Sequence, residues 1–151
     1  DTKISNILFD KATGNVLCAI DLDTVMSSTS LNDFGDAIRF GANTAAEDET
    51  DLSKVSLDLD LFKIYAFGFI EGCNGSLSKD EIRLLPVGAM MMTLECGIRF
   101  LTDYLNGDVY FKTRYADHNL DRARNQFALL ADMERKQAKM DEIIENIIKK
   151  Q

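Results

Sequence analysis

The last part of the chain carries the feature that most limits the possible fold. After Asn119, apolar residues recur at intervals that fit one face of a helix, at positions 120, 123, 127, 130, 133, 140, 144 and 147. This spacing predicts a single amphipathic α-helix. At 1.5 Å per residue the helix would be roughly 45 Å long, which is longer than a domain of this size is wide. We therefore expect Asn119 to cap the helix and its last two turns to overhang.

Further helices are predicted upstream. Apolar spacing indicates a helix over residues 31–40 and a strongly apolar core helix from Asp58 to about Asn74. The segment 78–81, Ser-Lys-Asp-Glu, is a capping box that begins the next helix. Because proline favours the first turn of a helix, we expect Pro86 to start another one, ending near Leu105 before an Asn-Gly pair.

The front of the chain predicts a β-hairpin. Residues 6–10 and 16–22 read as two short strands, and the turn between them ends in Gly14. The fold class is therefore α+β and mostly α, with one hairpin followed by four to five helices. We expect residues 1–151 to form one domain.

Composition excludes several functions. With 17 basic and 25 acidic residues the net charge is −8, so nucleic acid and anionic membranes are not expected partners. No apolar run approaches the roughly 18–20 residues that cross a bilayer. Cys18, Cys73 and Cys96 have no C-x-x-C spacing, which predicts three small buried residues in a reducing cytoplasm.

The first 24 residues carry the chemistry. Asp1 and Asn6 are five positions apart directly before a strand, and Lys3 lies between them. This is the spacing of a kinase catalytic loop, in which the Asp accepts a proton from the attacking hydroxyl and the Asn binds magnesium. A second metal-binding carboxylate is needed on the next strand, and Asp21 occupies that place. An Asp at the end of an apolar strand is costly without a cation or another strong partner.

Other acidic residues compete for these roles. Residues 33–35 spell Asp-Phe-Gly, the magnesium motif of protein kinases, but they lie beyond the hairpin. We expect Asp33 to be a helix-start residue, with Asp23, Asp33 and Asp36 as further candidates for shaping the site. The acidic run 47–51 is expected to be a solvated loop. His118, the only histidine, is expected to serve as a local cap or to lie on the surface.

The longer motifs resemble the aminoglycoside-phosphotransferase and choline-kinase family. The pattern Asp-Thr-Lys-Ile-Ser-Asn-Ile-Leu-Phe-Asp, followed by Ala-Ile-Asp-Leu-Asp, is similar to that family's catalytic loop and metal-binding strand. The resemblance is closest to the bacterial N-acetylhexosamine 1-kinases. Segments 33–41, 93–103 and 118–122 also resemble that group, so the similarity runs from Asp1 to about Glu134.

The resemblance implies a protein-kinase-like C-terminal lobe that transfers a phosphoryl group from ATP, with Mg²⁺, to the anomeric hydroxyl of an N-acetylhexosamine. Asp1 would be catalytic, Asn6 and Asp21 would bind the metal, and Arg99 and Tyr110 would contact the sugar. While no sugar is bound, Arg99 is also expected to meet water or a neighbouring carboxylate, Glu95 or Asp103. In this family the nucleotide lobe precedes the catalytic loop. This chain is therefore expected to be inactive alone.

Two alternatives stay open at this point. A choline or aminoglycoside kinase of the same fold would hold a cationic substrate, for which the acidic run 47–51 could serve. A helical interaction module could retain a kinase-like hairpin without catalysis. In either case a dimer through the exposed lobe face or the C-terminal helix is a further expectation.

Overall fold

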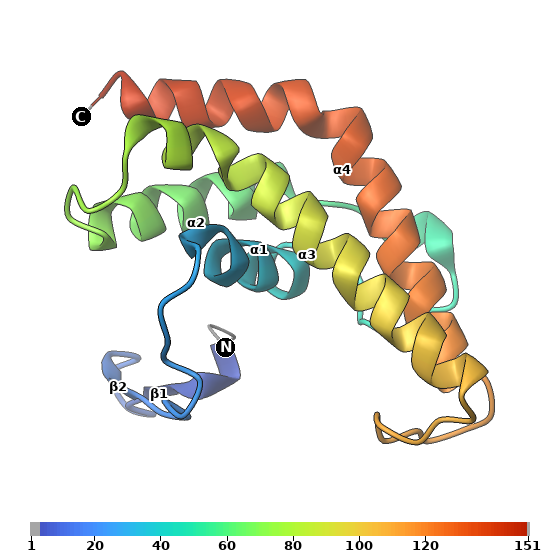
Figure 1. The fold of residues 1–151 in the computed structure, drawn as a ribbon. Coiled ribbons are helices and arrows are strands. Elements are labelled where there is room, and N and C mark those ends of the chain that lie inside the picture. Colours follow the sequence, from blue (N-terminus) through green and yellow to red (C-terminus); the bar gives the residue numbers. More distant parts are fainter. Residues whose placement is uncertain (1–3, 151) are drawn as a thin grey trace.

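Residues 4–150 are described by the structure, a computed structural model, and they form a helical body with a hairpin set apart from it (Figure 1). The elements in chain order are a 3₁₀ turn (Ile4–Asn6), β1 (Ile7–Phe9), β2 (Val16–Ala19), α1 (Ser30–Gly41), a 3₁₀ turn (Leu52–Lys54), α2 (Leu59–Gly72), α3 (Lys79–Leu105) and α4 (His118–Ile148). Within this range the predicted α+β, mostly helical class is confirmed.

The predicted start and end of α3 are confirmed, but the role predicted for Pro86 is wrong. The Ser78 hydroxyl accepts a hydrogen bond from the Glu81 amide at 3.2 Å, and the Glu81 carboxylate accepts one from the Ser78 amide at 2.8 Å. This capping box begins a helix that runs through Pro86 to Leu105. The proline ring is buried, and its missing amide removes only one bond from a helix of 27 residues.

Helix α3 lies at the centre of the body, with α1 and α4 packed along it. Two glycines allow the close approach of α1. A Cβ at Gly35 would overlap the backbone carbonyl of Gly88, and a Cβ at Gly88 would meet the Leu31 carbonyl oxygen at 2.8 Å. By length and composition alone α3 is also apolar enough to cross a membrane. The expectation that no apolar stretch approaches this length is therefore wrong, and packing against α1 and α4 buries only 39% of the stretch.

The prediction that α2 is buried all round is wrong. Phe62, Ala66 and Ile70 face the core, whereas Ile64 is 69% and Phe67 51% exposed. The buried face meets Phe34 of α1, whose ring lies 5.8 Å from that of Phe62 in an edge-to-face arrangement. Because α2 packs on one side only, its other apolar side chains remain on the surface.

The predictions for both ends of α4 are also wrong. The helix begins at His118, after Asp117 in a left-handed conformation, and Asn119 lies buried inside the first turn. At the other end, Met140 and Ile144 are buried, so the last turns do not overhang. The helix curves along its length (Figure 1) and is tied to α3 by the Arg83–Glu145 ion pair at 2.8 Å.

The acidic run 47–51 is not a solvated loop. Glu47, Asp48 and Glu49 are half-buried. Glu47 pairs with Arg39 at 2.7 Å, and Asp48 lies 3.2 Å from Nε2 of His118. His118 is fully buried rather than on the surface. These contacts fasten the connection between α1 and α2 to the first turns of α4.

The hairpin also leaves apolar side chains on the surface. Its two strands are antiparallel, with Ile7 opposite Ala19 and Leu8 opposite Cys18. Val16 and Leu17 are each 63% exposed. Cys18 is exposed, while Cys73 and Cys96 are half-buried, so the prediction of three buried thiols is wrong.

Candidate functional site

The hairpin brings together two of the predicted metal-binding residues. The Ile20 amide donates to the Asn6 carbonyl at 2.8 Å, which extends the strand pairing by one step beyond Ile7 and Ala19. As a result the Asn6 side-chain amide reaches the Asp21 carboxylate at 3.4 Å. Asp1 and Lys3, the other candidates from the catalytic loop, lie outside the described residues.

The backbone at Asp21 explains how this carboxylate reaches Asn6. Asp21 has φ 64°, in the left-handed region, so the chain turns immediately after the strand. Asp and Asn tolerate this conformation better than most residues because their short polar side chains bond locally. Oxygen ligands of this kind, a carboxylate beside an amide, suit Mg²⁺.

The Asp-Phe-Gly segment is explained by helix packing. Asp33 lies in the first turn of α1, where a negative charge is favourable, and this fits the prediction of a helix-start residue. Phe34 is fully buried, and Gly35 provides the close contact with α3. Asp36 pairs with Arg39 at 2.9 Å. Asp23 is exposed in the loop between β2 and α1.

The structure also brings together the two predicted sugar-binding residues. The Arg99 guanidinium carbon lies 5.9 Å from the Tyr110 ring centroid and 5.5 Å from that of Phe111. Arg99 is exposed and Tyr110 is 72% exposed. Of the two carboxylates expected near Arg99, that of Asp103 is instead bonded to the loop that follows α3.

This loop depends on Asp103, which sequence reasoning missed as a structural residue. Its side chain accepts hydrogen bonds from three consecutive amides, those of Val109 at 3.1 Å, Tyr110 at 2.8 Å and Phe111 at 2.9 Å. Asn119 adds a fourth bond from its side chain, at 3.0 Å. The available signal was a carboxylate in the last turn of a helix, a position where the helix dipole disfavours negative charge.

The carboxylate of Asp103 is held in its charged form. Burial acts to raise its pKa, but the bonds from the three amides and from Asn119 together bring the pKa below the ordinary value of an aspartate. Asn119 is fully buried and also donates to Asp108 at 2.9 Å. The loop is therefore fixed from beneath by two buried polar side chains.

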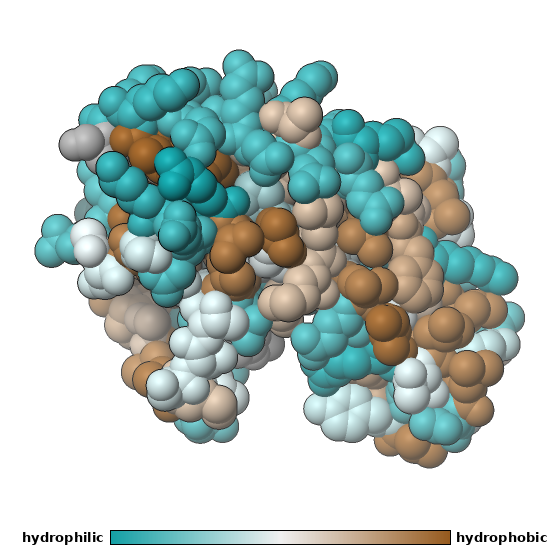
Figure 2. Space-filling model, turned by 45° about the horizontal axis from the view of Figure 1, so that its top comes forward, coloured by the Kyte–Doolittle hydropathy of each residue, from teal (hydrophilic) through white to brown (hydrophobic). Residues whose placement is uncertain are grey.

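The hairpin and this loop project from the same side of the helical body, at opposite ends of it (Figure 1). In the space-filling view the surface is hollowed between these two projections (Figure 2). The Asn6–Asp21 pair in the hairpin and the Arg99–Tyr110 pair beside the loop after α3 therefore lie towards opposite ends of the body.

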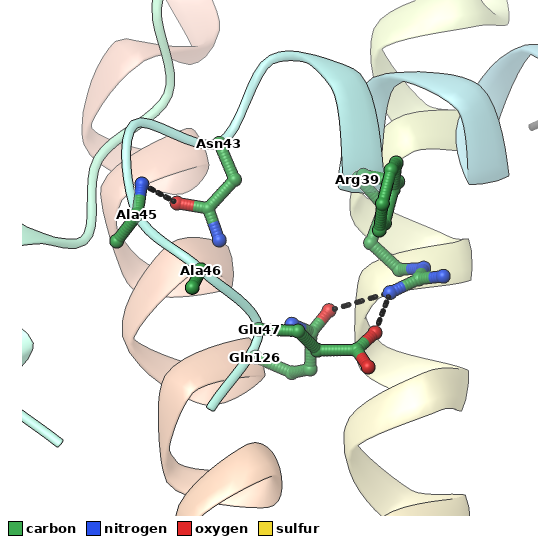
Figure 3. Close-up of a pocket in the computed structure, with 7 residues that line it drawn as sticks. Arg39, Asn43, Ala45, Ala46, Glu47 and Gln126 are labelled. Carbon is green, nitrogen blue, oxygen red and sulfur yellow. Dashed lines mark hydrogen bonds and ion pairs between the residues drawn. The ribbon is translucent and has the colours of Figure 1, made fainter. Parts of the chain in front are cut away.

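A separate small pocket does not fit a sugar. It lies between α1, the connection after it and α4, and its volume is about 90 Å³. In Figure 3, Arg39 points at Glu47 and Gln126, with which it bonds at 2.7 and 3.4 Å. Ligand pockets are usually about 300–1,000 Å³, so we assign this pocket a structural role.

Neither the grouping of metal-binding side chains nor the known protein families point to another functional site. Among residues 4–150, no three His, Cys, Asp or Glu side chains are grouped so that they could hold a metal ion. A comparison with protein-family models finds none that matches the sequence. The candidate functional residues are therefore the Asn6–Asp21 pair in the hairpin and the Arg99–Tyr110 pair.

Proposed function

We propose that this chain is the catalytic, kinase-like lobe of an ATP-dependent phosphotransferase whose acceptor is the anomeric hydroxyl of an N-acetylhexosamine. The observation that carries the proposal is the contact between Asn6 and Asp21 at 3.4 Å across the hairpin. Two residues 15 positions apart, each predicted from spacing to bind a metal, lie side by side. We expect the protein to act in the cytoplasm.

Each residue has a defined part in this proposal. Asn6 and Asp21 would hold Mg²⁺, which neutralises charge on the phosphates of ATP. Asp1 would orient the sugar hydroxyl and accept its proton. Phosphoryl transfer depends chiefly on positioning and charge neutralisation. The lobe that binds the nucleotide is therefore as necessary as these three side chains.

The acceptor is proposed from the chemistry of the second pair. An arginine donates several hydrogen bonds in a fixed plane to sugar oxygens, and a tyrosine ring packs on the face of a sugar. A cationic acceptor is less well supported. The carboxylates of Glu47, Asp48 and Glu49 already face Arg39, His118 and Lys54.

The test is a matched pair of charge-removing variants in the complete protein, Asp21→Asn and Asp33→Asn. Asparagine keeps the shape of the side chain and tolerates the left-handed backbone at position 21. We expect Asp21→Asn to lower kcat for sugar phosphorylation on the order of 10²-fold, and Asp33→Asn to change it little. Loss of activity in Asp33→Asn with Asp21→Asn active would reverse the assignment.

A panel of substrates tests the identity of the acceptor independently of the type of reaction. N-acetylglucosamine, N-acetylgalactosamine, choline and an aminoglycoside are each offered with ATP and Mg²⁺. Phosphorylation of either N-acetylhexosamine supports the proposal. If only choline or the aminoglycoside were phosphorylated, the proposed acceptor would be wrong. The proposal that the protein is a kinase would still stand.

A further inference from the structure

We propose that Asp103 and Asn119 are positioning residues for the acceptor sugar. They hold the loop between α3 and α4 so that Arg99 and Tyr110 form a binding surface before the sugar arrives. This inference rests on the proposed function, since it concerns the same sugar site.

The first support is the contrast between buried anchors and exposed side chains. Asp103 is 5% exposed and Asn119 fully buried, whereas Tyr110 is 72% exposed. Even so, the amide of Tyr110 is one of the three that Asp103 fixes, at 2.8 Å. The exposed aromatic residue therefore extends from a backbone segment that has little freedom to move.

The second support is a line of ring contacts from the core to the surface. Phe100 is buried, and its ring lies 4.7 Å from the ring of Phe111. Phe111 in turn contacts the Tyr110 ring at 4.8 Å, edge to face. The guanidinium of Arg99 lies over both outer rings. The bond from the Phe111 amide to Asp103 therefore also holds in place the two rings that Arg99 contacts.

The third support is that α3 can end without the bonds that the Asp103 side chain makes to the loop. Gly107 and Asp108 both have positive φ, and the Asp108 amide bonds to the Asp103 carbonyl at 2.9 Å, which ends the helix. The side chain of Asp103 goes further and fixes the next three amides. Binding sites gain affinity when their contact groups are ordered in advance, because less entropy is lost on binding.

The test compares Asp103→Asn with Tyr104→Phe in the complete protein. The first removes the charge that binds the amides of residues 109–111. The second removes the 2.9 Å bond from Tyr104 to Asp117, which lies in the same connection but does not touch that segment. We expect Asp103→Asn to raise the KM for N-acetylglucosamine roughly 10-fold, with kcat and the KM for ATP within about twofold of wild type. Tyr104→Phe should leave all three constants unchanged.

A binding measurement gives a readout that does not depend on turnover. N-acetylglucosamine is titrated into ¹⁵N-labelled protein, and the amide resonances of residues 109–111 are followed. We expect them to shift in the wild type, and at roughly 10-fold higher sugar concentration in Asp103→Asn. Protein that shifts in this way but never phosphorylates a sugar would refute the proposed function and still support this inference.

Two results would overturn the inference. One is an unchanged sugar KM in folded Asp103→Asn, and the other is the absence of any sugar-induced shift at residues 109–111 in the wild type. If Asp103→Asn does not fold, Phe111→Leu replaces it, because that change removes the ring beneath Arg99 and keeps the Asp103 bonds. An unchanged sugar KM in Phe111→Leu would equally overturn the inference.

Discussion

The hairpin and the loop after α3 carry the two halves of the proposed site, yet they are held in different ways. The loop is fastened to the helical body by buried side chains, as the four bonds to Asp103 show. The hairpin is held mainly by its own strand pairing, and Val16, Leu17 and Leu22 stay exposed. Within the described residues, the half proposed to bind the sugar is therefore ordered by the fold, whereas the half proposed to bind the metal depends on a two-stranded sheet.

The largest expected effect is in the helical body. Phe34 is fully buried and contacts the rings of Phe62, Tyr65 and Phe69. Phe34→Ala should lower the free energy of unfolding by about 3–5 kcal/mol, because it leaves a cavity at the centre of the core. Phe67→Ala, at a half-exposed position of α2, is the control and should cost less than about 1 kcal/mol. Urea denaturation measures the unfolding free energy of both variants. Equal losses would show that Phe34 does not lie at the centre of the core.

A smaller loss of stability is expected at acidic pH. Burial acts to raise the pKa of Asp132, but its bonds with Lys136, the Leu57 amide, Ser56 and Arg135 lower the pKa to about 2. Because this is below the value of about 3.9 for an unperturbed aspartate, Asp132 stabilises the fold above pH 4 and loses that contribution as the pH falls towards 2.

Asp132→Asn tests this contribution, which is at most about 2.6 kcal/mol. The difference in unfolding free energy between pH 7 and pH 2.5 should be smaller in the variant than in the wild type. An identical difference in the two proteins would mean that Asp132 does not take part in the acid response.

The next effect concerns only the half proposed to bind the sugar. Arg99→Ala should raise the KM for the sugar roughly 10-fold, which is about 1.4 kcal/mol, and leave the KM for ATP almost unchanged. Arg83→Ala is a suitable control, because Arg83 lies on the same helix and pairs with Glu145, away from the loop. A rise in both Michaelis constants would indicate a general structural change instead.

The smallest effect is expected in the hairpin. Leu17 is 63% exposed, so Leu17→Ser should change the unfolding free energy by no more than about 0.5 kcal/mol. Hydrogen exchange should also be faster at the amides of β2 than at those of α3, because a two-stranded sheet is marginally stable alone. Slow exchange in β2 would contradict the contrast between hairpin and body.

Local signals in the sequence predicted the elements well. The capping box at Ser78, the Asn-Gly end of α3 and the hairpin turn each depend on residues that are neighbours in the chain. The pairing of Asn6 with Asp21 was also within reach, since strand register follows from a short turn. These features require no knowledge of distant contacts.

What the sequence could not supply were contacts between distant segments. The burial of His118 depends on Asp48, which is 70 positions away, and the exposure of Phe67 depends on which face of α2 lacks a neighbour. Pro86 was misjudged because packing of α3 between two helices outweighs one lost hydrogen bond. The anchoring role of Asp103 likewise appears only once the loop has folded back over it.

The three cysteines have a practical consequence for labelling. Burial raises the pKa of Cys96 to about 11 and also raises that of Cys73, so neither forms much of the reactive thiolate at neutral pH. Cys18 is exposed on β2. A maleimide dye added at neutral pH would therefore attach first to Cys18. Its fluorescence would report directly on whether the hairpin is open to water or covered.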